Sequence, residues 1–483
     1  MSEKACSTHP VPPVLPVDPP PKKPWREVWQ VYGEAATWRM LLLGFSAGLP
    51  LVLVLGTLSF RLREAGIDRT TIGFLSWVGL IYAFKWVWAP LVDRMSIPIM
   101  TTLIGRRRSW LLLSQTVIFI GLIFMALINP QLNLKQLVWC ALLVAFGSAT
   151  QDIALDAFRI ESADVKHQAT LAAAYQTGYR IAMIWAGAGI FWIAAISEVK
   201  PVDGVSAACV AFNQAAQVSV NTATTPTVVV ASASYQHEAW MVGYLTMAAS
   251  MLLGMVTVIF SREPISVACK PTKNAREWIK GALVDPFADF VGRYRWQAVV
   301  VLGLIATYRV SDVVMGIMAN PFYVDMCYSK LEIATVTKIY GVIMTLVGAF
   351  AGGALAMRFG VMRVLMLGAV LSAASNLLFA WLGSRGHDVN ALIFVISADN
   401  LASGIASAAF IAYLSSLTNV NYSATQYALF SSMMLLLPKF LAGYSGSYVD
   451  ALGYSHFFTA TALLGLPVLV LVALASRIKP PQA

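Results

Sequence analysis

The chain alternates between long apolar runs and short polar stretches. A helix that crosses the hydrocarbon core of a bilayer needs about 20 mostly apolar residues. Runs of about this length lie near residues 40–60, 72–92, 109–129, 136–157, 169–196, 239–260, 296–319, 335–357, 362–383, 391–417, 424–446 and 454–476. The pattern predicts an all-α membrane protein with twelve transmembrane helices, in two sets of six.

The composition supports lipid as the solvent for much of the surface. Of the 483 residues, 58% are hydrophobic and 12% are charged, and the mean hydropathy is +0.69. A soluble domain carries roughly 25% charged residues. The net charge of +10 does not indicate a nucleic-acid partner, because the basic residues lie mainly in short loops between apolar runs. The chain has no nucleophile elbow, zinc-binding helix motif or phosphate loop, so we expect no enzymatic activity, no metal and no other cofactor.

The distribution of Lys and Arg orients the predicted helices. When loops are assigned to alternate sides, 22 of these residues fall on the side of the N-terminus and 8 on the other, and Lys85, Arg180, Arg309 and Lys439 fall within helices. Cytoplasmic loops carry the excess of positive charge. We therefore expect both termini in the cytoplasm. We also expect the chain to lie in the inner membrane and to act as a monomer.

The same assignment divides the chain into segments. Residues 1–39 are rich in proline and are expected to form a disordered cytosolic tail. The remaining segments are a six-helix bundle at 40–260 with a periplasmic loop at 198–238, a cytosolic linker at 261–295, a second six-helix bundle at 296–476 and a tail at 477–483. Six plus six helices around a basic central loop is the plan of major facilitator transporters, in which two bundles rock around a site near the bilayer midplane.

A charged loop between the second and third helices resembles the signature loop of these transporters. It contains Asp93 and Arg94, followed by Gly105, Arg106, Arg107 and Arg108. Asp93 could pair with a nearby arginine or a helix N-terminus and hold the bundles in one state. About ten residues separate the two parts of this motif, more than in the family form. An ordinary charged cytosolic turn is the alternative.

Two acidic residues lie inside the fourth predicted helix. Asp152 and Asp156 are one turn apart, so they share one helix face about 6 Å apart. Burial and mutual repulsion favour a proton on one of the two acids, which is what a proton-coupling site requires. The alternative for Asp156 is a cytosolic charge network with Arg159, Glu161 and the three consecutive arginines.

Other polar residues also fall within predicted spans, where ionisable groups are costly and usually face a cavity or a partner. Arg180 lies roughly 16 Å into its helix and could bind a carboxylate or pair with the two acids. Lys85 could extend toward the headgroups. The remaining members of this polar set are Gln151, Tyr179, Arg309, Asp312, Asp399, Asn400, Gln426 and Lys439.

Several segments resemble the AmpG-type muropeptide permeases of Gram-negative bacteria. The clearest run is Ser148-Ala-Thr-Gln151-Asp152-Ile-Ala-Leu-Asp156-Ala157, followed by Gly178-Tyr179-Arg180. Further matches are Gly44-Phe-Ser-Ala-Gly48 in the first helix, Gly105-Arg-Arg-Arg108 and Ser423-Ala-Thr-Gln426. The resemblance covers roughly residues 36–476 and is clearer in the N-terminal half. Its best-known members carry two further C-terminal helices, and the loop at 201–238 is long in this chain.

The resemblance implies proton-driven import of N-acetylglucosaminyl-anhydromuramyl peptides for peptidoglycan recycling, with an indirect effect on β-lactamase induction. On this hypothesis, Asp152 and Asp156 carry the proton. Arg180 and Arg309 meet peptide carboxylates, while Asp399, Asn400 and Gln426 contact hydroxyl and amide groups. Gln151, Tyr179 and Asp312 complete the expected substrate site. A related carrier for a siderophore or another anionic metabolite is the alternative.

Overall fold

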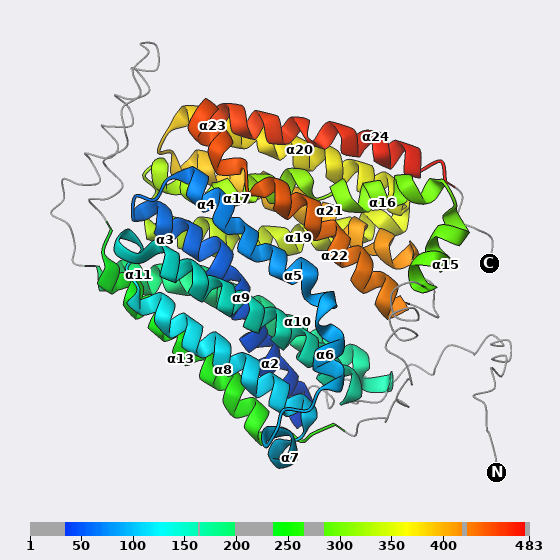
Figure 1. The fold of residues 1–483 in the computed structure, drawn as a ribbon. Helices are drawn as coiled ribbons and strands as arrows, with labels where there is room; N and C mark the ends of the chain where they lie inside the picture. Colours follow the sequence, from blue (N-terminus) through cyan, green and yellow to red (C-terminus); the bar gives the residue numbers. More distant parts are fainter. Residues whose placement is uncertain (1–33, 163–164, 199–234, 265–284, 418–422, 479–483) are drawn as a thin grey trace.

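The computed structural model describes residues 34–162, 165–198, 235–264, 285–417 and 423–478, together with most of their side chains. Within these ranges the chain forms helices and no strand (Figure 1). Eleven helices there are long and apolar enough to cross a membrane. A further helix, α22, falls at the eleventh predicted position, and its apolar part is Ser432–Ala442. The predicted all-α membrane fold is confirmed.

The N-terminal half comprises the elements from α2 to α13, several of which join end to end into one span. They are α2 (Ala35–Val52), η1 (Leu53–Thr57), α3 (Leu58–Glu64), α4 (Arg69–Leu75), η2 (Ser76–Gly79), α5 (Leu80–Phe84), η3 (Lys85–Val87), α6 (Ala89–Arg94), α7 (Met100–Ile104), α8 (Arg106–Leu127), α9 (Pro130–Glu161), α10 (Val165–Ile184), η4 (Trp185–Gly189), α11 (Ile190–Ser197) and α13 (His237–Phe260).

The C-terminal half comprises the elements from α15 to α24. They are α15 (Asp285–Tyr294), α16 (Gln297–Thr307), α17 (Val310–Asp325), α18 (Lys330–Glu332), η7 (Ile333–Tyr340), α19 (Gly341–Phe359), α20 (Val361–Arg385), α21 (Val389–Leu417), α22 (Ser423–Ala442), α23 (Ser445–Leu463) and α24 (Gly465–Ala475). In Figure 1 the two halves lie side by side, blue to green and green to red.

Several helices begin earlier than the apolar runs predict, the first and the eighth among them. The first starts at Ala35, so the end of the segment predicted as a disordered tail is helical; residues 1–33 lie outside the described part. The eighth span starts at Lys330 and not near 335. A capping box at Ser329 and Glu332 explains the earlier start of the eighth span. The Ser329 side chain accepts a hydrogen bond from the backbone N–H of Glu332, and the Glu332 side chain accepts one from the backbone N–H of Ser329. Lys338, which lies near the start of the predicted run 335–357 and was grouped with the adjoining loop, lies well within this span.

Close helix contacts in the N-terminal half depend on small residues. At Gly44 and Gly48 of α2, an added Cβ would lie 2.2 and 2.5 Å from the carbonyl oxygens of Tyr175 and Tyr179 of α10. At Gly178 of α10 it would lie 1.9 Å from that of Leu41. Small residues let transmembrane helices approach at backbone distance. The glycines in the resemblance motifs therefore fix the packing of the first helix against the fifth.

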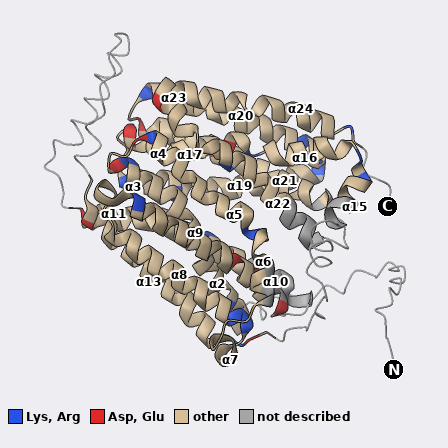
Figure 2. Ribbon diagram, viewed as in Figure 1, with Lys and Arg blue, Asp and Glu red and all other residues tan. Residues whose placement is uncertain are grey.

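The charged residues gather at the two ends of the helices, with few between them (Figure 2). Large apolar side chains such as Trp139 and Phe350, 72% and 82% exposed, lie on the outer surface between these ends. A surface of this kind matches a lipid environment. The chain is a multi-pass membrane protein.

One end of the molecule joins the two halves through ion pairs. Asp325 of α17 accepts bonds from Arg63 at 2.6 Å and Arg69 at 2.9 Å, and Asp450 of α23 pairs with Arg69 at 3.0 Å. Lys330 donates to Glu64 at 2.6 Å and also to Glu198. Among the described side chains, every ion pair that joins the two halves lies at this end, near α3 in Figure 1.

Candidate substrate cavity and proton site

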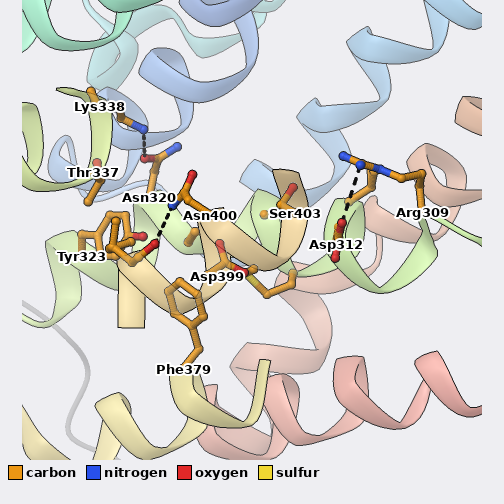
Figure 3. A pocket seen from close by; sticks show the side chains of 15 residues that line it. Arg309, Asp312, Asn320, Tyr323, Thr337, Lys338, Phe379, Asp399, Asn400 and Ser403 are labelled. Atoms are coloured by element: carbon orange, nitrogen blue, oxygen red, sulfur yellow. Dashed lines mark hydrogen bonds and ion pairs between the residues drawn. The ribbon is translucent and has the colours of Figure 1, made fainter. Parts of the chain in front are cut away.

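A cavity of about 260 Å³ lies in the C-terminal half, next to its contact with the N-terminal half. We call it the central cavity. Figure 3 shows its polar lining, which includes Arg309, Asp312, Asn320, Tyr323, Thr337, Lys338, Asp399, Asn400 and Ser403. Four of these carry charge, two of each sign. The structure thus brings together four of the residues predicted from sequence: Arg309, Asp312, Asp399 and Asn400.

Arg309 lies at the break between α16 and α17, where the backbone leaves the helical conformation at φ −96°, ψ 5°. Its Nη1 donates to the Ser407 hydroxyl at 2.6 Å and lies 3.8 Å from Asp312 Oδ2. Asp312 also accepts a hydrogen bond from Ser372. Broken helices near the midplane are typical of transporter binding sites, because they expose backbone and side-chain polar groups to a cavity.

Asp399 and Asn400 come from adjacent positions of α21. The Ser375 hydroxyl donates to Asp399 Oδ1 at 3.0 Å. Asn400 Nδ2 donates to the Ile396 carbonyl at 3.0 Å, and its Oδ1 accepts from Thr345 at 2.8 Å. Asn400 therefore ties α21 to α19 while it lines the cavity, whereas Asp399 has no cation within ion-pair distance among the described side chains.

Lys338 is a cavity residue that the sequence interpretation missed. It lies in η7, where the helix widens to the π form, a feature common at functional sites. Its Nζ donates to Asn320 Oδ1 at 3.0 Å and lies 6.0 Å from the centre of the Phe191 ring in the N-terminal half. A lysine within the apolar run 335–357 was the available signal, but the residue was grouped with the adjoining loop and not with the ionisable residues of the spans.

In the N-terminal half, Asp152 pairs with Lys85 at 3.5 Å. Lys85 lies in η3 of the second span, so the two residues predicted separately meet across helices. Tyr82, Tyr175 and Tyr179 lie close enough to Asp152 to interact with it electrostatically. The one ion-pair partner described for the acid is thus Lys85.

Asp156 is placed differently from Asp152. It is exposed and lies 3.6 Å from Arg159, three residues further along the same helix. Arg180 is exposed, and its one described polar contact is Met183 Sδ at 3.8 Å. Within the described residues Arg180 therefore pairs with neither acid.

Gln151 is not among the residues that line the central cavity. It is fully buried between α9, α2 and α8, where its Nε2 donates to Ser46 Oγ at 2.8 Å. Gln115 donates to the same hydroxyl at 3.1 Å. The structure places Gln151 in helix packing, apart from the other predicted substrate residues.

The Gly105–Arg108 loop is held by acids and carbonyls of its own half. Glu263 accepts from the backbone N–H groups of Arg107 and Arg108 at 2.8 and 3.2 Å, and so caps α8. The Arg107 guanidinium contacts Glu161 at 2.6 Å. Gly105 adopts φ +93°, and an added Cβ would lie 2.4 Å from Glu263, so glycine is required there. The side chains of Asp93, Arg94 and Gln426 lie outside the described residues.

Comparison with known proteins agrees with this architecture. Among solved structures, the chain is similar to a bacterial homologue of the human lysosomal transporter Spinster, with a TM-score of 0.65, 15% identity and coverage of 94% of this chain and 98% of that one. It is also similar to a D-xylose–proton symporter, with a TM-score of 0.63, 14% identity and coverage of 90% and 96%. These likenesses confirm the major facilitator fold.

Sequence relatives identify the family. A family model described as acetyl-coenzyme A transporter 1 matches residues 37–186. The anhydromuropeptide permease of Escherichia coli K12 is 29% identical over 92% of this chain and 80% of its own length. Putative transporter AmpG 4 of Rickettsia felis is 31% identical over 92% of this chain and 97% of its own. The relatives are permeases and not enzymes, and the chain belongs to the AmpG family of small-molecule transporters.

Proposed function

We propose that this protein imports N-acetylglucosaminyl-anhydromuramyl peptides across the inner membrane for peptidoglycan recycling, with proton entry as the driving reaction. Import would also influence β-lactamase induction indirectly. The observation that carries the proposal is the central cavity, which places two cations and two carboxylates around one space, in a chain related to an anhydromuropeptide permease.

The cavity lining suits a substrate with both sugar and peptide parts. Arg309, with Arg180 from the N-terminal half, would bind peptide carboxylates, since guanidinium groups bind planar anions in a bidentate manner. Asp399, Asn400 and Gln426 would bond hydroxyl and amide groups. Tyr323 and Phe379 also line the cavity and offer apolar faces. A cavity of this size holds part of such a substrate, so the two bundles at 40–260 and 296–476 would have to move during transport.

Asp152 would carry the coupling proton. Its pairing with Lys85 at 3.5 Å links protonation to a contact between two helices, because a neutral acid no longer attracts the ammonium group. Asp156, one turn nearer the end of the helix and exposed, would connect this site to water. Both termini would face the cytoplasm, the protein would act as a monomer, and Asp93 and Arg94 would join the Gly105–Arg108 loop in gating.

Uptake of labelled anhydromuropeptide into a permease-deficient strain tests the proposal. Expression of this chain should restore uptake, and an uncoupler should abolish it. The control is a strain that expresses a transporter of a different substrate, a major facilitator sugar symporter, to the same level. If the chain is expressed in the membrane and no labelled anhydromuropeptide enters, the proposed substrate is wrong.

The match of residues 37–186 to the acetyl-coenzyme A transporter model supports a second candidate, a carrier of another anionic metabolite. A siderophore carrier belongs to the same alternative. These candidates predict that the metabolite competes with, or replaces, the muropeptide in binding to the purified protein. Titration of both ligands in parallel separates the two hypotheses.

A further inference from the structure

Lys338 places a half-buried positive charge where the two halves meet. Its side chain leaves the C-terminal half from η7 and packs against Gly187 of η4, at which an added Cβ would lie 3.6 Å from the lysine stem. The ring of Phe191 lies 6.0 Å from the ammonium nitrogen. The cation therefore lies at the edge of the central cavity that faces the N-terminal half (Figure 3).

This charge has a neutral partner only. The Nζ atom of Lys338 donates to the amide oxygen of Asn320 at 3.0 Å, and among the described side chains no carboxylate oxygen lies within 4.0 Å of it. The acids that line the same cavity have other partners, since Asp312 contacts Arg309 and Ser372 while Asp399 contacts Ser375. A half-buried ammonium group within a span and without a counter-ion is costly, and an anion in the cavity would reduce that cost.

Asn320 links this cation to the opposite half. Its Oδ1 accepts from Lys338, while its Nδ2 donates to the Gly56 carbonyl at 3.0 Å and lies 3.4 Å from the Ser59 hydroxyl. Gly56 and Ser59 belong to the first span. The Asn320 amide group therefore joins Lys338 to the N-terminal half. A ligand group that takes the place of the amide oxygen beside Lys338 would change this contact between the halves.

We infer that Lys338 is the binding site for a carboxylate of the transported ligand, which displaces the Asn320 amide oxygen from the ammonium group. The identity of the ligand as a peptide-bearing muropeptide rests on the proposed function. Arg309 does not serve this role alone, because its guanidinium already contacts Asp312 and Ser407. Binding at Lys338 releases one end of the Asn320 bridge and so couples ligand arrival to the contact between the halves.

Binding to the purified, full-length protein in lipid nanodiscs tests the inference. The two probes are an anhydromuropeptide with free peptide carboxylates and the same molecule with those groups converted to amides. The wild-type protein should bind the acid at least about tenfold more tightly, a difference of 1.4 kcal/mol. The Lys338→Gln variant should bind both probes with similar affinity. Its affinity for the acid should be weaker than that of the wild-type protein, and its affinity for the amide should be unchanged.

Asn320→Asp is the matched variant. It preserves the shape of the side chain and supplies a fixed carboxylate beside Lys338. This carboxylate occupies the position that the ligand carboxylate would otherwise take. It should lose the preference for the acid as Lys338→Gln does, although the lysine remains. Asn320→Ala, which empties the position, should keep the preference. A preference that survives in Asn320→Asp or in Lys338→Gln overturns the inference.

Two further outcomes separate this inference from the proposed function. Equal binding of both probes to the wild-type protein overturns the Lys338 assignment and leaves muropeptide transport intact. If neither probe binds, the proposed substrate fails, and a ligand-free double-mutant cycle decides the inference. In that cycle, Asn320→Asp should lower the melting temperature less with Lys338 present than in the Lys338→Gln background. An equal effect in both backgrounds shows that no carboxylate fits at Lys338 and overturns the assignment.

Discussion

The Asp152 site of the N-terminal half and the Lys338 and Asp399 positions of the central cavity accommodate charge in different ways. In the N-terminal half, Asp152 lies 3.5 Å from Lys85, so the charge is balanced within that half. In the C-terminal half, Lys338 contacts an amide and Asp399 contacts a hydroxyl, and neither has an oppositely charged partner within ion-pair distance among the described side chains. A balanced pair can respond to a proton without a ligand. Unpaired charges around a cavity need a ligand to balance them.

This difference indicates separate tasks for the two regions. Protonation of Asp152 changes one contact between the second and fourth spans, without any need for a larger molecule. Lys338 and Asp399, by contrast, gain most when a ligand supplies an anion and a donor, because the cost of burying each charge then falls. We therefore expect substitutions in the N-terminal pair to affect coupling and those in the central cavity to affect affinity.

The largest effect is expected for Asp152→Asn. The neutral amide cannot exchange a proton, so gradient-driven accumulation of substrate should fall by about 100-fold, within the usual range of coupling free energies. Equilibrium binding of anhydromuropeptide should change by less than about threefold. Uptake into membrane vesicles with an imposed pH gradient, compared with binding to the purified variant, measures both quantities.

The Lys85→Gln variant serves as the control for this prediction, because it removes the partner of Asp152 and keeps the acid. It should retain proton-dependent uptake, with a shifted pH profile. Gradient-dependent accumulation by Asp152→Asn would show that the proton binds elsewhere, and the two halves would then not divide their tasks as described.

A smaller effect is expected for Asp399→Asn in the central cavity. Hydrogen bonds to charged groups contribute about 1.5–3 kcal/mol, so affinity for the substrate should fall by about tenfold. Proton coupling should persist, measured as the ratio of accumulation with and without a gradient at saturating substrate. Loss of coupling with unchanged affinity would reverse the assignment of the two regions.

Gln151→Ala separates packing from substrate contact next to Asp152. The variant removes one hydrogen bond to Ser46 within a buried interface, where Gln115 still donates to the same hydroxyl. We expect a loss of stability of about 1 kcal/mol, read from the melting temperature, and unchanged affinity for substrate. Reduced affinity without reduced stability would support the substrate-binding role that the sequence predicts for Gln151.

The smallest effect is expected for Arg180→Ala. Because Arg180 is exposed and has no described acidic partner, its contribution to binding an anion should be a few tenths of a kcal/mol, at most about 1 kcal/mol. Affinity for the carboxylate-bearing ligand should fall by less than about fivefold, with no change in melting temperature. A loss as large as that of Asp399→Asn would place Arg180 at the ligand in the bound state.

The sequence predicted the number and order of the helices, because hydrophobic length is a strong and local signal. It also selected Asp152, Arg309, Asp312 and Asp399, since charge within an apolar run is costly and visible. It did not reveal that Lys85 is the partner of Asp152 or that Gln151 packs against Ser46, because helix rotation and pairing depend on contacts far apart in the chain. Lys338 was missed because it lies near the start of the apolar run 335–357 and was grouped with the adjoining loop, whereas the helix already begins at Lys330, after the cap at Ser329.

The central claim is that substrate entry is coupled to proton entry through Asp152. Purified protein in proteoliposomes with an entrapped pH dye tests it directly, when anhydromuropeptide is added outside in the absence of any imposed gradient. The wild-type protein should acidify the lumen only when substrate is present, and Asp152→Asn should show binding without acidification. Substrate uptake by the wild-type protein with no change in lumenal pH would contradict the account.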